Sequence, residues 1–189
     1  MQPTASVIIT ACWIIFLFYW LARAWSTKQT TERQSLPSAL AHRIPIALGW
    51  YLMVFFRLPQ PWNLQLVPHD YAAMIIGSAV CLSGLFVTIW ARRTLAGNWS
   101  SDVTFKQDHE LIRTGPYRYV RHPIYTGLLI MCLGTAVEVG KLRCWVGLVL
   151  VGIGFWIKLN QEERLMLEHF PAAYSLYRKQ VKALVPWLL

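Results

Sequence analysis

Five apolar stretches separated by polar connections dominate the pattern of hydrophobic and polar positions along the chain. They cover residues 6–25, 44–58, 71–91, 124–137 and 144–159. A helix rises about 1.5 Å per residue and a bilayer core is about 30 Å thick, so runs near 20 residues can cross it. The second run is short and would have to thin the bilayer or recruit flanking residues. The pattern predicts an all-α integral membrane protein with about five transmembrane helices.

The connections between these stretches predict their arrangement. A turn of about six residues, 138–143, joins the last two runs and predicts an antiparallel helical hairpin. Three segments, 23–43, 92–121 and 158–182, hold 15 of the 18 Lys and Arg residues. Because cytoplasmic loops carry the excess of basic residues, we expect an outside amino terminus and a cytosolic carboxyl terminus. The first run has no basic region before it and no convincing cleavage site, which favours a retained helix over a signal peptide.

The carboxyl tail, residues 160–189, is too polar to be a span. Apolar residues recur in it at intervals of three and four, as on one face of a helix. They are Phe170, Tyr174, Tyr177, Val181 and Leu184. Pro171 suits a first turn, because its missing N–H is unsatisfied there anyway. The tail therefore predicts an amphipathic helix lying at the membrane interface.

Composition supports the membrane assignment. Charged residues make up 14% of the chain, against about 25% in soluble domains, and the mean hydropathy is +0.39. The net charge of +9 does not indicate nucleic-acid binding, because the basic residues lie between apolar runs and suit contacts with anionic membrane lipids. The four cysteines form no CxxC or Cys/His pattern, so no metal site is predicted and they are interpreted as packing residues.

Polar, aromatic and turn-forming residues are most densely grouped at residues 97–127, GNWSSDVTFKQDHELIRTGPYRYVRHPIYTG. Pro123 suits the first turn of the fourth run, which places Arg121 and His122 at a helix N-terminus, where a carboxylate or phosphate is favoured. Tyr125 lies one turn deeper. Taken singly, Arg121 suits lipid phosphates, His122 a backbone hydrogen bond, and Tyr117 and Tyr125 an interfacial aromatic belt.

A second polar group follows the fifth run. Lys158 and Glu162 are i,i+4 neighbours, so a local ion pair worth about 0.3 kcal/mol is one interpretation. Glu162 and Glu163 point about 100° apart on a helix, so one can face a ligand while the other faces solvent. The hairpin brings this group to the same side as Arg121 and His122. The sequence thus predicts one cytosolic pocket for a ligand that carries both a carboxylate and a positive centre.

These motifs resemble those of the membrane isoprenylcysteine carboxyl methyltransferases and their phospholipid N-methyltransferase relatives. The resemblance rests on HELIRTGPYRYVRHPIYTG, a hairpin, EE, and F-P-x-x-Y-x-x-Y-x-x-x-V-x-x-x-V-P, and it covers about residues 95–187. It implies S-adenosyl-L-methionine as cofactor and methyl transfer to a lipid-like or prenylated-cysteine-like acceptor in the membrane. Residues 1–93 then form N-terminal transmembrane helices and residues 94–189 the catalytic region. The compact chain suggests a prokaryotic-type member in an inner membrane.

The resemblance also implies roles for single residues. Positions that match cofactor contacts are His109, Glu110, Leu111, Ile112, Tyr117, His122, Pro123, Ile124, Tyr125, Glu162 and Glu163. Arg121 and Lys158 are the candidate catalytic residues. Lys158 stands where isoprenylcysteine enzymes place a substrate-binding Arg, and a Lys keeps the charge but cannot hold a carboxylate through two parallel bonds.

Two alternatives remain at this stage. A membrane NADPH-dependent reductase of the sterol-reductase type also carries an RHP-x-Y element, but the paired Glu and F-P-x-x-Y favour the methyltransferase. The second alternative is a membrane-anchoring or transport component. Transport would require polar or broken positions inside the spans, and these interiors are nearly free of charge. A Rossmann-type site is excluded, because no GxGxxG unit occurs. The sequence specifies neither the acceptor, nor O- against N- or S-methylation, nor the oligomeric state.

Overall fold

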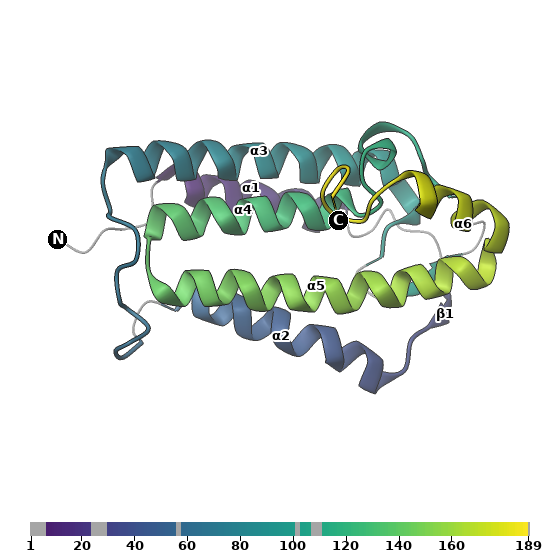
Figure 1. Ribbon diagram of the computed structural model, residues 1–189, viewed down its shortest axis with the longest axis horizontal. Coiled ribbons are helices and arrows are strands. Elements are labelled where there is room, and N and C mark those ends of the chain that lie inside the picture. Colours follow the sequence, from purple (N-terminus) through teal and green to yellow (C-terminus); the bar gives the residue numbers. More distant parts are fainter. Residues whose placement is uncertain (1–6, 24–29, 56–57, 101–102, 107–110, 189) are drawn as a thin grey trace.

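A computed structural model describes residues 7–23, 30–55, 58–100, 103–106 and 111–188 and shows a helical bundle. Its helices are α1 (Val7–Arg23), α2 (Leu36–Val54), α3 (Tyr71–Leu95), α4 (Pro123–Val139), α5 (Leu142–His169) and α6 (Pro171–Gln180), with 3₁₀ turns η1 (Ala96–Asn98) and η2 (Gly115–Arg118). Strands β1 (Thr30–Arg33) and β2 (Thr104–Lys106) pair antiparallel near the end of the bundle that carries α6 (Figure 1). The predicted helical architecture is confirmed, apart from this short ribbon.

The outward faces of the bundle are apolar. Large exposed side chains that do not line the cavities include Phe18 and Leu21 on α1, Leu40, Ile44 and Leu48 on α2, Ile75, Ile76, Leu82 and Phe86 on α3, and Val149, Ile153 and Trp156 on α5. Exposed apolar surface of this extent is unfavourable in water and suits a bilayer. By length and composition, the helices Tyr71–Asn98 and Leu142–His169 can cross a membrane. The number of spans, five, stays a prediction.

Helix α2 begins earlier than its apolar run predicted. It covers Leu36–Val54, whereas the sequence placed a short span at 44–58 and a polar connector before it. Pro37 lies in the first turn, where a proline is tolerated, and so helps the helix to start within the polar segment. At 1.5 Å per residue its 19 residues extend for about 28 Å, so the helix recruits flanking residues, the second of the two expected solutions, and thinning of the bilayer is unnecessary.

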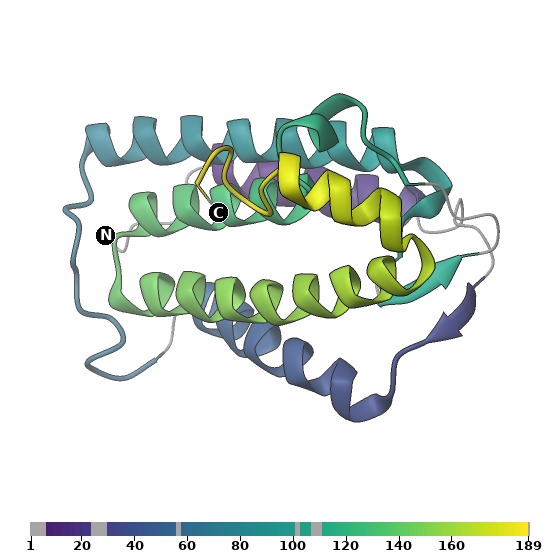
Figure 2. The ribbon, with the colours of Figure 1, turned by 45° about the vertical axis from the view of Figure 1, so that its right-hand side comes forward.

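Helix α5 continues past its predicted end at residue 159 and reaches His169, so its 28 residues extend for about 42 Å. Its last turns, which carry Glu162 and Glu163, are therefore a rigid continuation of a span instead of part of a polar tail. Helix α6 begins at Pro171 as predicted but ends at Gln180. Its buried residues Tyr174 and Tyr177 pack against the protein, and the segment after it folds back toward α4 (Figures 1 and 2).

The predicted hairpin of α4 and α5 is confirmed, with a tighter turn than expected. Helix α4 ends at Val139 and α5 begins at Leu142, so Gly140 and Lys141 alone connect them. Gly140 has φ +68°, the left-handed conformation that commonly ends a helix and that glycine adopts without strain. The N-terminus of α4 and the C-terminal half of α5 consequently lie on the same side of the bundle.

Glycines let the helices pack backbone to backbone in two pairs. A Cβ on Gly84 of α3 would lie 2.6 Å from the carbonyl oxygen of Gly127 on α4, and one on Gly49 of α2 would lie 2.6 Å from that of Gly147 on α5. Close approach through small residues is how membrane helices gain packing energy when lipid offers no hydrophobic driving force. The pairs α3–α4 and α2–α5 are thus rigid units, and the space between them holds the cavity described below.

Candidate active site

The segment before α4 is fixed by the chain's C-terminal segment. Gly115 adopts φ +58° and opens the η2 turn, which leads to Arg121 and His122. The backbone N–H of Arg121 donates to the carbonyl of Lys182 (2.8 Å), and that of His122 donates to the carbonyl of Ala183 (3.0 Å). These two N–H groups therefore bind the protein itself. The expected anion site at this helix entrance must use side chains in their place.

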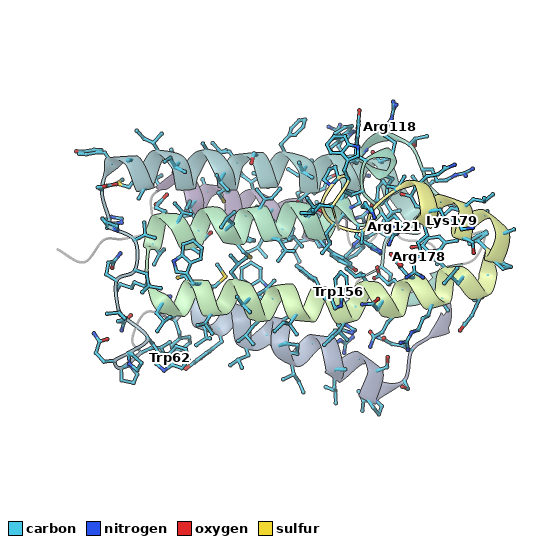
Figure 3. All side chains as sticks on the ribbon, viewed as in Figure 1. Trp62, Arg118, Arg121, Trp156, Arg178 and Lys179 are labelled. Atoms are coloured by element: carbon cyan, nitrogen blue, oxygen red, sulfur yellow. The ribbon has the colours of Figure 1, made fainter. Side chains whose placement is uncertain are left out.

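Glu163 forms the centre of a buried ion cluster. Its Oε1 accepts from Nε of Arg121 (2.8 Å) and lies 2.6 Å from Nη2 of the same guanidinium and 3.2 Å from Nε2 of His122. Its Oε2 lies 3.2 Å from Nε of Arg178 on α6. Figure 3 shows Arg121 and Arg178 together at the α6 end of the bundle, far from Trp62 at the other end. Glu163 thus links α4, α5 and α6 through charge-assisted bonds.

Glu162, the neighbouring carboxylate, has a different environment. Its Oε1 accepts from the Tyr125 hydroxyl at 2.6 Å and lies 3.9 Å from Nζ of Lys158, and its Oε2 lies 3.5 Å from Nδ1 of His122. The Lys158–Glu162 contact is the i,i+4 pair considered from the sequence. The Glu162 side chain keeps 24% of its surface exposed, against 4% for Glu163. The two carboxylates face apart as predicted, with Glu162 directed at a cavity, but Glu163 is buried in ion pairs instead of facing solvent as expected.

His122 contacts both carboxylates through its two ring nitrogens, which requires a proton on each nitrogen. Burial on its own lowers the pKa of His122. Its hydrogen bonds to Glu162 and Glu163 outweigh burial, so the pKa of His122 is raised above its usual value. The raised pKa favours an imidazolium between the two carboxylates.

Tyr125 lies at the centre of an aromatic stack. Its ring is parallel to that of His122 (5.5 Å between centroids) and to that of Phe155 on α5 (4.7 Å). Nζ of Lys158 lies 5.4 Å from the centroid of the Tyr125 ring, within range of a cation–π interaction. The stack fixes the position of the Tyr125 hydroxyl beside Glu162.

Two cavities meet at this stack. The smaller, of about 140 Å³, lies beside Glu162 and His122 and reaches α6. The larger, of about 1170 Å³, lies among α1, α2, α4 and α5 and has mainly apolar walls. Three residues, Trp99, Ile124 and Tyr125, line both. A small polar cavity and a large apolar one thus share a wall.

The site residues predicted from the sequence differ in which of the two cavities they line. Those that line the small cavity are Leu111, Ile112, Tyr117, Arg121, His122, Ile124, Tyr125 and Glu162. Lys158 lines the large cavity, whereas Pro123 and Glu163 are buried beside the site and line neither. His109 and Glu110 lie outside the described residues.

Sequence reasoning missed part of the lining. From the end of the η1 turn and the two residues after it come Asn98, Trp99 and Ser100, and from α5 and α6 come Leu165, Met166, Tyr174 and Tyr177. The first group lies in the dense segment 97–127, and the two tyrosines lie on the apolar face identified in the tail. His42 and Gln161, which hydrogen bond to each other beside the large cavity, had no motif to mark them.

Comparison with known proteins places the chain in a family. The sequence profile described as phospholipid methyltransferase matches residues 72–173, which include α3, α4, α5 and most of the ion cluster. The chain belongs to the phospholipid methyltransferase family. This confirms the superfamily expected from the motifs, and the same findings give the sterol-reductase alternative no support.

Three similar proteins from different organisms are all named protein-S-isoprenylcysteine O-methyltransferase. The protein-S-isoprenylcysteine O-methyltransferase of Schizosaccharomyces pombe is 36% identical over 84 residues, covering 42% of this chain and 34% of its own length. That of Saccharomyces cerevisiae is 26% identical over 117 residues, covering 60% and 49%. That of Dictyostelium discoideum is 24% identical over 165 residues, covering 86% and 70%. The chain spans a third to a half of the length of the two yeast relatives.

A solved structure supports the fold. The eukaryotic intramembrane Ras methyltransferase, isoprenylcysteine carboxyl methyltransferase, matches with a TM-score of 0.60 and 22% identity, over all of this chain and 69% of the other. The two proteins share a fold. The α1 and α2 helices, which line the large cavity, lie outside the family match at 72–173 but inside this structural match.

Proposed function

We propose that the chain is an S-adenosyl-L-methionine-dependent methyltransferase of the carboxyl O-methyltransferase type, acting on a lipid-like or prenylated-cysteine-like acceptor. One observation carries the proposal. A mixed-charge cavity and a large apolar cavity share the wall of Trp99, Ile124 and Tyr125. A water-soluble methyl donor suits the first and a lipid chain the second. The names of the similar proteins agree with this assignment.

The residues of the small cavity fit the methyl donor. S-adenosyl-L-methionine carries a carboxylate, an ammonium and a sulfonium, and the cavity offers Glu162 for the positive groups and Arg121 and His122 for the carboxylate. When bound, the donor supplies an electrophilic methyl group. At about 140 Å³ the cavity is smaller than the 300–1,000 Å³ of typical ligand sites, so binding requires its walls to separate. The wall formed by Tyr174 and Tyr177 belongs to the short helix α6, and its movement would have to break the Arg178–Glu163 ion pair and the Tyr177–Tyr117 hydrogen bond but not the glycine-packed pairs.

The large cavity fits the acceptor. Its walls come from Trp13, Phe16 and Trp20 of α1 and Trp50 of α2, among others, and Lys158 lines it close to the shared wall at Tyr125. An apolar chain can lie among these rings while the Lys158 ammonium attracts an anionic accepting group toward the wall. A carboxylate needs no general base, since it is already a nucleophile at neutral pH. The protein then contributes alignment of the two reactants and exclusion of water.

The site's position agrees with a cytosolic working face. The basic residues Arg118, Arg121, Arg178 and Lys179 lie at the α6 end of the bundle (Figure 3), where the excess of positive charge predicts the cytosol. A soluble donor would enter from this side, while a lipid-like acceptor would arrive from the bilayer. The amino terminus would then face outward, and the inner membrane of a prokaryote stays a prediction.

Calorimetry on the purified protein in detergent tests the cofactor assignment. We expect S-adenosyl-L-methionine to bind, and His122→Ala and Glu162→Gln to lose measurable binding. Glu168→Gln, the same change at an exposed position of α5, is the matched control and should bind like the wild type. Binding of NADPH without binding of S-adenosyl-L-methionine would refute the proposal. Membranes incubated with methyl-labelled donor then identify the acceptor through the labelled product.

A further inference from the structure

The large cavity has a second charged end, remote from the small cavity. Lys141 and Arg143, at the start of α5, line it there, whereas Lys158 lines it beside the shared wall at Tyr125. Along α5, the distance from Arg143 to Lys158 is about 22 Å. The backbone N–H of Arg143 donates at 3.1 Å to the carbonyl of Trp62, which marks this end of the bundle in Figure 3. The second charged end therefore lies opposite the ion cluster.

Arg143 is a buried cation at this end. It is 5% exposed, and its Nη1 donates to the carbonyls of Leu52 (2.9 Å) and Met53 (2.6 Å) at the C-terminus of α2. These two bonds fix the guanidinium but use only one of its three nitrogens. Its Nε is buried and has no hydrogen-bond partner among the described residues. The protein thus holds this guanidinium at the cavity wall without satisfying all of its donors.

The charge at this end is not neutralised by the part of the chain that the structure describes. None of the ion pairs formed there includes Lys141 or Arg143. Glu138, the carboxylate nearest along the chain, is fully buried, accepts from the Ser78 hydroxyl on α3 at 3.0 Å, and does not line the cavity. A buried cation without an anion is costly, so an anion from outside the chain would stabilise this end.

The cavity's shape and lining indicate which anion fits. A guanidinium binds phosphate oxygens through its planar fork of donors, and a neighbouring ammonium adds a point charge. The other walls are mainly apolar and include Trp13, Trp20 and Trp50. One leaflet contributes about 15 Å of a 30 Å bilayer core, so an acyl chain anchored at Arg143 fits within the cavity and ends before Lys158. Phospholipids combine such a phosphate with such a chain.

We propose that Lys141 and Arg143 bind the phosphate of an anionic phospholipid from the adjoining leaflet, and that its acyl chain occupies the large cavity. Because about 22 Å separates this phosphate from the end of the cavity at Lys158, the lipid is a bound ligand and not a methyl acceptor. Under the predicted topology the adjoining leaflet is the outer one. The inference goes beyond the proposed methyltransferase function and does not depend on it, since the small cavity takes no part.

Binding of radiolabelled lipids to the delipidated protein in mixed micelles tests the proposal without any enzymatic assay. Dioleoylphosphatidylglycerol carries the phosphate, and dioleoylglycerol has the same chains without it. For the wild type we expect Kd to be about tenfold lower for the first lipid, the effect of a hydrogen bond to a charged group. The ratio should fall to about threefold in Lys141→Gln and to about one in Arg143→Gln. Lys179→Gln, the same change at an exposed position of α6, is the matched control and should keep the wild-type ratio.

The Lys141 variant protects the test against a loss of folding. Arg143→Gln also removes two bonds to the end of α2, whereas the Lys141 side chain makes none of the hydrogen bonds or ion pairs seen in the described residues. A wild-type ratio near one, or an unchanged ratio in Lys141→Gln, overturns the site. Inorganic phosphate in large excess should leave phosphatidylglycerol bound. If it displaces this lipid as well as unlabelled lipid does, the site binds phosphate alone and the lipid assignment is wrong.

Discussion

Replacing Tyr125 by phenylalanine isolates one contact at the wall between the two cavities. The hydroxyl of Tyr125 donates to Oε1 of Glu162 at 2.6 Å, and the change removes only this oxygen. The ring stays between His122 and Phe155, so the stack and both cavity linings are kept. We therefore expect Tyr125→Phe to weaken the binding of S-adenosyl-L-methionine while the protein stays folded.

The magnitude follows from the charge on Glu162. A hydrogen bond to a charged group contributes about 1.5–3 kcal/mol, which corresponds to roughly 10- to 150-fold in an equilibrium constant. His122 and Lys158 also contact Glu162 and continue to hold the carboxylate after the hydroxyl is removed. The loss should consequently lie near the lower end, at about tenfold in Kd.

Titration calorimetry of the cofactor and initial rates with the acceptor check this prediction together. The acceptor KM should change by about twofold or less, because the phenyl ring still lines the large cavity. Tyr119→Phe, an exposed tyrosine of the same segment that lines neither cavity, is the matched control and should leave both values unchanged. A cofactor affinity equal to that of the wild type would show that cofactor binding does not depend on the hydrogen bond from Tyr125 to Glu162. A rise confined to the acceptor KM would show that the Tyr125 hydroxyl acts on acceptor binding and not on cofactor binding, against the prediction.

Two further predictions concern stability. Gly84→Ala places a Cβ 2.6 Å from backbone atoms of α4 and should lower the free energy of unfolding by about 1–3 kcal/mol. Gly152→Ala places a Cβ 3.8 Å from a flexible Leu129 methyl and should be neutral or stabilise α5. Thermal unfolding in detergent compares the two variants, and equal Tm values would contradict close α3–α4 packing. The raised pKa of His122 means that its contribution to stability is complete below the unfolded pKa of about 6.5 and is lost as pH rises through the folded pKa. The Tm difference between the wild type and His122→Phe should therefore narrow from pH 6 toward pH 9. A difference that widens with pH would contradict the imidazolium.

The sequence predicted the existence of the helices better than their ends. Hydropathy marks where a chain is apolar, and the helices α2 and α5 continue into polar sequence, to Leu36 and to His169. The residues after Leu159 are strong helix formers, so propensity could have extended α5, but an apolar window could not. The glycine contacts were also readable in part: Gly77 and Gly84 are seven residues apart, as are Gly127 and Gly134, which is one face of a helix.

The site was predictable where it depended on topology alone. A short turn between two helices forces their far ends together, so Arg121, His122 and Glu162 converge although about 40 residues separate them. The separate environments of Glu162 and Glu163 were not predictable in detail. They depend on α6, which brings Arg178 onto Glu163, and the direction of a short helix after a long one leaves no pattern in sequence.

The place of His42 beside the large cavity could not be predicted from the sequence either. The apolar run began at residue 44, so the hydropathy pattern left His42 in a connector, and no motif joined it to Gln161 more than a hundred residues away. Only the α2–α5 contact, made possible by Gly49, Gly147 and Gly154, brings the two together. The family match covers most residues of the small cavity but not Tyr174 and Tyr177, and α1 and α2 line the large cavity from outside it. If the large cavity holds the acceptor as proposed, acceptor choice can change through the N-terminal helices while the small cavity stays fixed, because among the described residues the two cavities share three, Trp99, Ile124 and Tyr125.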